Sequence, residues 1–436
     1  MFRSLTRRQF LSQSGRAAAT VGVAGSLLSA CGGTTGKTTS SEPVTLTYGW
    51  WSNDPTKDNA MLAWVQDFVH THPNITIKAE ILPWNSYWTK LKTTTAGGNA
   101  YDIIGISAGA AAPYFDEGAL YDLSQFVDYQ DAVKNLAAAP LSEQTWNGKH
   151  YGLPVGIYIP LLGYNKNLLQ AAGIPFPDPV TPMTFDDFVA MGKKLTKFQN
   201  GKAVQYALHP SYFLSWDIFV YLAGGQVYDH PVNPTRMMLN SPEGIDGLSR
   251  YQQLFTENIS VPANLLKTGP FGSGDLPSLQ TGKVAFARTG AFDFQDMATT
   301  STNIGAAPIF SMNGRRAAVG TANSLGIYRK SKHPNEAWEF LKWAVQTPAE
   351  ISFAKFSDIP ADKGAFSQLD TILQPKEYVP TLRSDLNVFV TDVMTPKTQL
   401  ATVLTDIATD LQNGKITPAQ AAAKMEQQGN AVLSAS

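Results

Sequence analysis

The fold is decided by residues 44–104, which read VTLTYGWWSNDPTKDNAMLAWVQDFVHTHPNITIKAEILPWNSYWTKLKTTTAGGNAYDII. Residues 44–48 alternate apolar and polar side chains with the two-residue period of a strand. From Met61 to Val69 the apolar residues recur at helical spacing, and Pro73 ends that helix. The same criteria predict three further elements: a strand over 75–81, a helix from Trp84 that ends at Gly97, and a buried strand over 101–104. This β-α-β-α-β order is typical of a doubly wound α/β lobe.

A second series of α/β elements begins after Asn147-Gly148. Thr184-Phe185-Asp186-Asp187 resembles a capping box that opens a helix to about Phe198, and Ser241-Pro242 places an N-cap residue before a proline at the first helical position. The other predicted elements are strands over 157–164, 284–288 and 303–309, a short helix over 167–172, a helix that opens at Asn335, and helices from Pro396 onward. Two α/β lobes are the simplest account of this order.

The first 31 residues resemble an export address. Thr6-Arg7-Arg8-Gln9-Phe10-Leu11 precedes an uncharged apolar run over 17–30, which matches the basic, apolar and small-residue parts of a signal peptide. The run has 14 residues, too few to span a bilayer, which needs about 20. The arginine pair resembles a twin-arginine signal. Leu28-Ser29-Ala30-Cys31 resembles a lipobox, which would make Cys31 the lipidated first residue. Residues 32–43, GGTTGKTTSSEP, predict a flexible linker.

Composition and charge exclude several classes of protein. The 436 residues include 34 basic and 35 acidic side chains and one cysteine. A single cysteine excludes an internal disulfide framework and a Cys-rich zinc site. Residues 1–30 carry four arginines and no acid, so the rest of the chain has 30 basic and 35 acidic residues and a net charge of −5. This mildly acidic body argues against nucleic acid or an anionic lipid surface as its partner.

One short motif leaves an enzyme interpretation open. Gly105-Ile106-Ser107-Ala108-Gly109 matches the nucleophile-elbow pattern G-x-S-x-G and follows a strand, as that motif requires. Histidines after it include His209, His230 and His333. The alternative is a loop of small residues at the end of a strand, where open α/β sheets bind ligands. The sequence has no phosphate-binding loop, dinucleotide fingerprint or H-E-x-x-H pattern, so we expect neither a cofactor nor a metal.

Aromatic residues are the positive functional signal. Trp50 and Trp51 directly follow the first strand, and Asn53 and Asp54 come next. A sugar ring needs a flat apolar surface for its C–H groups and directional partners for its hydroxyl groups. Loops that combine rings with polar groups at strand ends would supply both, although core packing explains any single tryptophan equally well. Similar combinations are found at Trp84 and Trp88, at Trp216, and at Phe292-Asp293.

Several segments resemble the family 1 extracellular solute-binding proteins, the maltose-binding-protein-like carbohydrate receptors of ABC importers. The matching segments are Tyr151-Gly152-Leu153-Pro154, residues 163–169 (GYNKNLL), Ala172-Gly173-Ile174, residues 184–188 (TFDDF), residues 280–286 (QTGKVAF), Gly326-Ile327 with residues 333–341 (HPNEAWEFL), and residues 414–421 (GKITPAQA). Their order and spacing extend the resemblance over nearly all of residues 44–436.

The resemblance implies the two-lobe periplasmic-binding-protein fold of the class II type, with hinge-linked α/β lobes and a ligand cleft between them. It implies chain crossings near residues 155–157, 304–308 and 347–348. The expected domains are therefore a signal peptide at 1–30, a lipidated linker at 31–43, a first lobe of 44–156 plus 304–347, and a second lobe of 157–303 plus 348–436. The expected ligand-binding residues are Trp50, Trp51, Asn53, Asp54, Trp84, Trp88, Ser107, Tyr158, Trp216, Phe292, Asp293 and Asn323.

The expected function is that of a lipid-anchored receptor that captures a mono- or oligosaccharide by lobe closure and delivers it to the permease and ATPase of an ABC importer. We expect a monomer on the outer face of the cytoplasmic membrane, with no catalytic residue. Two alternatives stay open. The same fold could bind a glycerol phosphate, a polyamine or a metal ion, because Asp54, Arg288 and Asp293 leave both charge signs available. Less expected is an exported hydrolase that uses Ser107 or a carboxylate pair.

Overall fold

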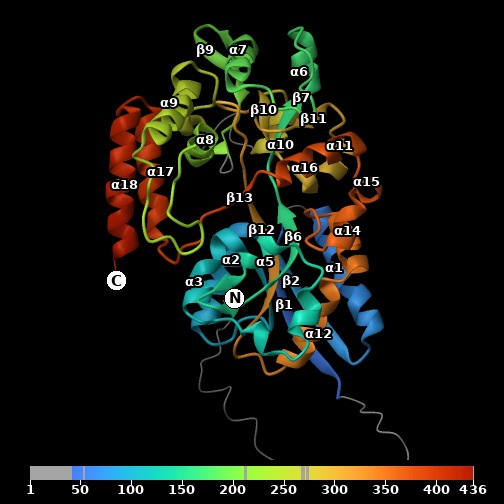
Figure 1. The fold of residues 1–436 in the computed structure, drawn as a ribbon. Helices are drawn as coiled ribbons and strands as arrows, with labels where there is room; N and C mark the ends of the chain where they lie inside the picture. The colour runs from blue at the N-terminus through green and yellow to red at the C-terminus, as the bar shows by residue number, and fades with distance from the viewer. Residues whose placement is uncertain (1–41, 53–54, 211–213, 267–270, 272–273, 436) are drawn as a thin grey trace, which may run out of the picture. The chain divides into compact units, whose positions relative to one another are not determined.

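The computed structural model describes residues 42–52, 55–210, 214–266, 271 and 274–435. Pro43–Ser436 form one compact unit, in which two β-sheets define two lobes (Figure 1). The predicted signal peptide, Cys31, residues 32–41 of the predicted linker, Asn53 and Asp54 lie outside the described residues. The unit combines sheets with flanking helices as the predicted α/β class requires.

The first sheet is mixed and forms the centre of the first lobe. Its strands, in spatial order, are β13 (Phe389–Thr391), β12 (Ala318–Ile327), β3 (Ile103–Ser107), β1 (Val44–Ser52) and β2 (Ile75–Pro83), and β6 (Leu153–Tyr158) also pairs with β12. The pairs of β1 with β2 and with β3 are parallel, as βαβ connections require, whereas β12 runs antiparallel to β3 and β6.

The second sheet forms the centre of the second lobe. Its strands, in spatial order, are β11 (Ile304–Ala307), β7 (Leu161–Asn165), β10 (Val284–Thr289), β9 (Lys202–Leu208) and β8 (Lys197–Gln199). A short hairpin, β4 (Thr145–Trp146) and β5 (Lys149–His150), stands apart from both sheets and turns at Asn147-Gly148, the dipeptide that the sequence marks as a break.

Helices cover both sheets. Those associated with the first lobe are α1 (Pro55–Thr71), α2 (Trp84–Ala96), α3 (Ala108–Asp116), η1 (Leu123–Gln125), α4 (Tyr129–Val133), α5 (Ala138–Ser142), α12 (Pro334–Ala344), α13 (Thr347–Ala354), α14 (Lys363–Ser367) and α15 (Leu369–Ile372). Those associated with the second lobe are α6 (Lys166–Ala171), α7 (Phe185–Leu195), α8 (Trp216–Ala223), α9 (Pro242–Thr256), η3 (Ala263–Leu265), α10 (Asp275–Gln280), η4 (Ala291–Asp293), α11 (Phe294–Thr299), η5 (Lys376–Tyr378), α16 (Val379–Leu386), α17 (Gln399–Gln412) and α18 (Pro418–Ser434). Figure 1 shows α17 and α18 side by side next to α9.

Local capping explains why several helices begin where the sequence predicts. The Thr184 hydroxyl accepts the backbone N–H of Asp187 at 3.1 Å and opens α7. The Ser241 hydroxyl accepts the N–H of Gly244 and opens α9, with Pro242 at the first position. The predicted end of α7 near Phe198 is wrong, because the chain becomes extended at Thr196 and continues into β8.

The chain crosses between the lobes at different places from those expected. Residues 157–164 do not form one strand, because Pro160, which has no N–H for a ladder, separates β6 in the first sheet from β7 in the second. The second crossing lies between β11 and β12, so residues 304–307 pair within the second sheet. At the predicted third crossing, α13 instead packs on α1 and β6. The sheet pairing thus places residues 304–307 with the second sheet, and the contacts of α13 place residues 347–354 beside the first.

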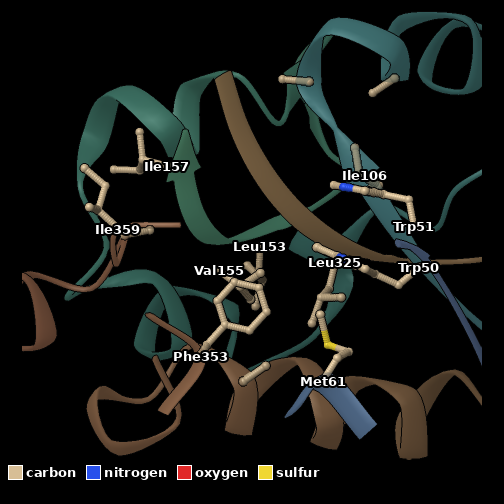
Figure 2. Packing of buried hydrophobic residues seen from close by; sticks show 14 of the residues in the cluster. Trp50, Trp51, Met61, Ile106, Leu153, Val155, Ile157, Leu325, Phe353 and Ile359 are labelled. Carbon is tan, nitrogen blue, oxygen red and sulfur yellow. The ribbon is translucent and has the colours of Figure 1, made fainter. Parts of the chain in front are cut away.

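The first strand extends further than predicted and carries both tryptophans into the core. β1 continues to Ser52, where Trp50 pairs in register with Ile81 and Trp51 with Leu82. Figure 2 shows the two indoles packed among Ile106, Leu325 and other buried apolar residues. Trp50 lies directly over Gly105, where an added Cβ would meet the ring carbon Cε3 at 2.4 Å. Gly105 is therefore required by the close approach of the ring.

We predict that Gly105→Ala lowers the free energy of unfolding by roughly 1–3 kcal/mol, the usual cost of forcing one extra carbon into a packed core. Urea denaturation followed by circular dichroism measures the change. Gly97→Ala is the matched control, because the nearest atom there is the end of the Asn99 side chain, which can move. Equal stability of the two variants would contradict the packing described for Trp50.

A buried carboxyl group supports β12 close to the hinge. The Glu143 side chain accepts the backbone N–H of Ala322 at 2.8 Å and is fully buried. Burial raises the pKa of Glu143 to about 8, against the hydrogen bond that favours its charged form. The folded state therefore holds a proton on Glu143 at pH values at which the unfolded chain releases it.

A carboxyl group with a raised pKa in the folded state stabilises less as the pH rises from its unfolded pKa towards its folded pKa. We therefore predict that the wild-type protein loses stability relative to Glu143→Gln between about pH 4.5 and pH 8. Urea denaturation of both proteins at one-unit pH steps measures the difference. A difference that stays constant over this range would show that Glu143 does not titrate there.

Candidate functional site

A pocket of about 520 Å³ lies between the lobes. Its first wall comes from α2 and α3 of the first lobe, and its second wall comes from the start of α8, Tyr228, residues 392–398 and α17. The volume is within the range of 300–1,000 Å³ that is usual for small-molecule sites. Both walls are needed to form the pocket, so its dimensions depend on how the lobes meet.

Aromatic rings stand on both walls of the pocket. Trp88 and Tyr114 line it from the first lobe, with ring centroids 5.9 Å apart. Trp216 and Tyr228 line it from the second lobe. Trp216 occupies the first position of α8, directly after its N-cap Ser215, and exposes only 8% of its surface. Aromatic residues thus line the pocket on two sides.

Trp88 is held in place by rings behind it. Trp51 stacks on Trp88 at 6.1 Å, and Trp84 and Tyr87 approach it edge-on at 5.4 and 5.2 Å. The buried indole N–H of Trp88 has no hydrogen-bond partner among the described residues. A buried donor without a partner is unusual in a native protein.

Polar groups alternate with these rings. Asp217 lines the pocket from α8, and Glu117 and Lys92 line it from the first lobe. Asp392, also in the lining, directly follows β13 and donates its backbone N–H to Gly320 of β12. The Ser215 hydroxyl donates to the Asp217 carboxylate. Gly109 lets Asp392 approach the first turn of α3, because an added Cβ would lie 2.9 Å from its Oδ2. The lining therefore contains hydrogen-bond acceptors and donors, and it includes both acidic and basic side chains.

Burial changes the acid–base behaviour of two lining residues. It raises the pKa of Asp217, although the hydrogen bond from Ser215 favours the charged form. It raises the pKa of Tyr114 to about 12, with a smaller contribution from the Glu117 carboxylate. At neutral pH the Tyr114 hydroxyl thus keeps its proton and can donate or accept.

The pocket brings together only some of the residues predicted from the sequence. Trp88 and Trp216 line it. Ser107 is buried at the N-cap of α3, the helix that supplies Gly109 to the lining. Trp84 lies behind Trp88. Trp50 and Trp51 are 3% and 5% exposed within the core of the first lobe, and they do not line this pocket.

Tyr158, Phe292, Asp293 and Asn323 gather in a separate polar cluster close to the hinge. Arg288 donates to the Tyr158 hydroxyl at 2.6 Å and to Asp275 at 2.7 Å, and its guanidinium lies over the Phe292 ring at 5.5 Å. On the side of the first lobe, the Asn323 amide donates to Asp358 at 2.6 Å. Burial raises the pKa values of Asp293 and Asp358 to about 6. The role of these residues in ligand binding stays a prediction.

Several residues that line the pocket were not predicted from the sequence. Tyr114 lies seven positions after Ser107 on the helix that follows the small-residue loop, and helical spacing could have indicated it. Asp217 directly follows Trp216, and that adjacency was available in the sequence. Asp392 and the first turn of α17 had no such signal, because the strand before them, β13, has only three residues.

The structure offers little for the alternative chemistries. Within the described ranges, no three His, Cys, Asp or Glu side chains are grouped so that they could hold a metal ion. His209 pairs with Asp275 at 2.9 Å and contacts the carbonyl of Phe271 at 3.2 Å. Ser107 exposes little surface. Among the described residues, no helix is long and apolar enough to cross a membrane.

Comparisons with known proteins agree with this architecture. The family model of bacterial extracellular solute-binding proteins matches residues 63–378. An ABC substrate-binding protein from Listeria monocytogenes, solved in complex with cycloalternan, superposes with a TM-score of 0.77 at 20% identity and covers 89% of this chain and 98% of its own. The GacH receptor of Streptomyces glaucescens, solved with acarbose, superposes with a TM-score of 0.74 at 18% identity. The superposition covers 89% of this chain and 98% of the receptor.

Relatives by sequence agree with the family model. The galactooligosaccharide-binding protein of Bacillus subtilis is 22% identical over 71% of this chain and 72% of its own. A binding protein of Brucella abortus is 24% identical over 66% of this chain and 69% of its own. The predicted two-lobe fold is confirmed by the superpositions, and the family model covers well over half of the chain. The chain belongs to the bacterial extracellular solute-binding proteins.

Proposed function

We propose that this protein is the substrate-binding subunit of an ABC importer and that it captures a sugar, a mono- or oligosaccharide, in the pocket between its lobes. The observation that carries the proposal is the pairing of rings on both walls, Trp88 and Tyr114 on one and Trp216 and Tyr228 on the other. Similar proteins named for binding cycloalternan, acarbose and galactooligosaccharides support the choice of a saccharide.

The lining groups suit an uncharged polyhydroxyl ligand. Ring faces would cover the C–H surfaces of a pyranose, and the carboxylates of Asp217 and Asp392 would accept its hydroxyl protons. Lys92 and Lys397 balance part of the acidic charge, so the pocket favours neither a phosphate ester nor a polyamine.

Lobe closure would provide the binding mechanism. A solute that contacts both walls binds the closed state more tightly than the open state and shifts the population towards closure. Hinge closure around a ligand is the established behaviour of periplasmic binding proteins in general. No bond of the solute is broken, so the proposal needs no catalytic residue. Lipidation at Cys31 would hold the receptor, as a monomer, on the outer face of the cytoplasmic membrane beside its permease.

A thermal-shift screen tests the class of ligand. We expect at least one saccharide to raise the melting temperature of the Pro43–Ser436 unit, because a ligand that binds only the native state stabilises it by mass action. The panel includes glycerol 3-phosphate, spermidine and calcium as representatives of the alternative solutes. Stabilisation by one of these three and by no saccharide would contradict the proposal. Incubation of a stabilising saccharide with the protein, followed by chromatography, should recover it unchanged.

Substitution of a wall ring tests the site. Trp216→Ala should weaken binding of the stabilising saccharide roughly five-fold, since a lost ring contact is worth about 1 kcal/mol. Trp88→Ala should act in the same direction, and isothermal titration calorimetry measures both. Phe198→Ala is the control, because Phe198 is 55% exposed on β8 and lies outside the pocket lining. Unchanged affinity in both tryptophan variants, with the fold intact by circular dichroism, would place the site elsewhere.

A further inference from the structure

Lys57 has an unusual position for a lysine. It lies in the first turn of α1, where the positive end of the helix dipole disfavours a cation by about 0.3–1 kcal/mol. Its side chain is only 11% exposed, although lysine is rarely buried without a partner. Neither helix propensity nor solvation accounts for this placement. The explanation must come from the groups that surround the ammonium.

The carboxylate that pairs with the Lys57 ammonium belongs to the other lobe. The Lys57 Nζ lies 3.0 Å from Oδ2 of Asp296 on α11, a residue that is 239 positions away in the sequence. α1 packs on β1 and β2 of the first sheet, whereas α11 follows β10 of the second sheet. The ion pair therefore joins the two lobes directly, outside the lining of the large pocket.

A second contact joins the same cation to the second lobe. The Lys57 Nζ lies over the Phe292 ring, 5.3 Å from its centroid, and Arg288 lies over the same ring at 5.5 Å. Phe292 thus contacts one cation from each lobe. The Lys57 charge also acts on two buried carboxyl groups, Asp293 of the second lobe and Asp358 of the first, and in each it favours the charged form.

Partial burial makes this pair stronger than an exposed one. A pair on the surface contributes little, because water and salt screen the charges. The Asp296 side chain is 34% exposed and that of Lys57 is 11% exposed, so the protein shields the pair from water mainly around the lysine. By contrast, Lys90 and Glu80 are more than 40% exposed and lie within the first lobe, which makes them a matched control.

We propose that Lys57 is a positioning residue for lobe closure, and that its contacts with Asp296 and Phe292 form a latch that holds the two lobes together. The inference rests on the proposed function, in which the lobes close over a solute. Separation of the lobes would break the ion pair and expose the Phe292 ring. The latch thus sets how much of the protein is closed before any solute binds, and through that population it sets the apparent affinity.

The test measures the distance between the lobes without any solute. Spin labels on cysteines at Thr93 of α2 and Asp406 of α17, both exposed, report that distance by pulsed electron resonance in the full chain carrying Cys31→Ser. We expect Lys57→Glu to lengthen the mean distance. The substitution places an acid in the first turn of α1, where the dipole favours it, so the helix should persist.

Exchange of the two charges separates a latch from a general structural role. The double variant Lys57→Glu with Asp296→Lys should restore the wild-type distance, and Lys90→Glu should leave it unchanged. An unchanged distance in Lys57→Glu, or a lengthened distance that the exchange does not restore, overturns the latch. Because no solute is present, either result leaves the sugar proposal to be judged by the thermal-shift screen alone.

Discussion

The pairing of β12 with β6 is the constraint on which the rest of the structure depends. The two strands run antiparallel, with Thr321 opposite Tyr158 and Ala322 opposite Ile157, at the point where the chain leaves the first sheet through Pro160. This pairing holds two of the crossing segments side by side, and the chain also passes between the lobes between α15 and η5 and on either side of β13. The position of one lobe relative to the other therefore depends on this region of paired backbone, which the buried Glu143 supports through its hydrogen bond with Ala322.

Local signals allowed much of the fold to be predicted. The caps at Thr184 and Ser241 and the periodicity of α1 and α2 lie within single elements, so the sequence alone specifies them. β12 was missed because its ten residues are all buried and mostly small, and a strand covered on both faces has no alternation to detect. At Trp50 and Trp51 the predicted strand was too short. β1 continues beyond its alternating residues to Ser52, so both indoles pack in the core.

The candidate site could be predicted only in part, for a related reason. Rings that project from helix starts, such as Trp88 and Trp216, can be found from composition and position. Asp392 and the start of α17 enter the pocket through tertiary contacts that no local pattern encodes. The predicted residues Tyr158, Phe292, Asp293 and Asn323 lie in the polar cluster by the hinge, where Arg288 and Lys57 both contact the Phe292 ring, and their role in ligand binding stays a prediction. The lobes thus contact each other through two regions of different chemistry, an aromatic pocket and an ionic cluster.

Hydrogen–deuterium exchange with and without a stabilising saccharide tests the central claim most directly, because it reports which backbone segments the solute protects. A solute held between the two walls should slow exchange in α2, α3, the first turn of α8 and the segment 392–405, which supply the residues that line the pocket. Protection confined to one lobe, or found only in elements remote from this pocket, would contradict a solute held between two walls.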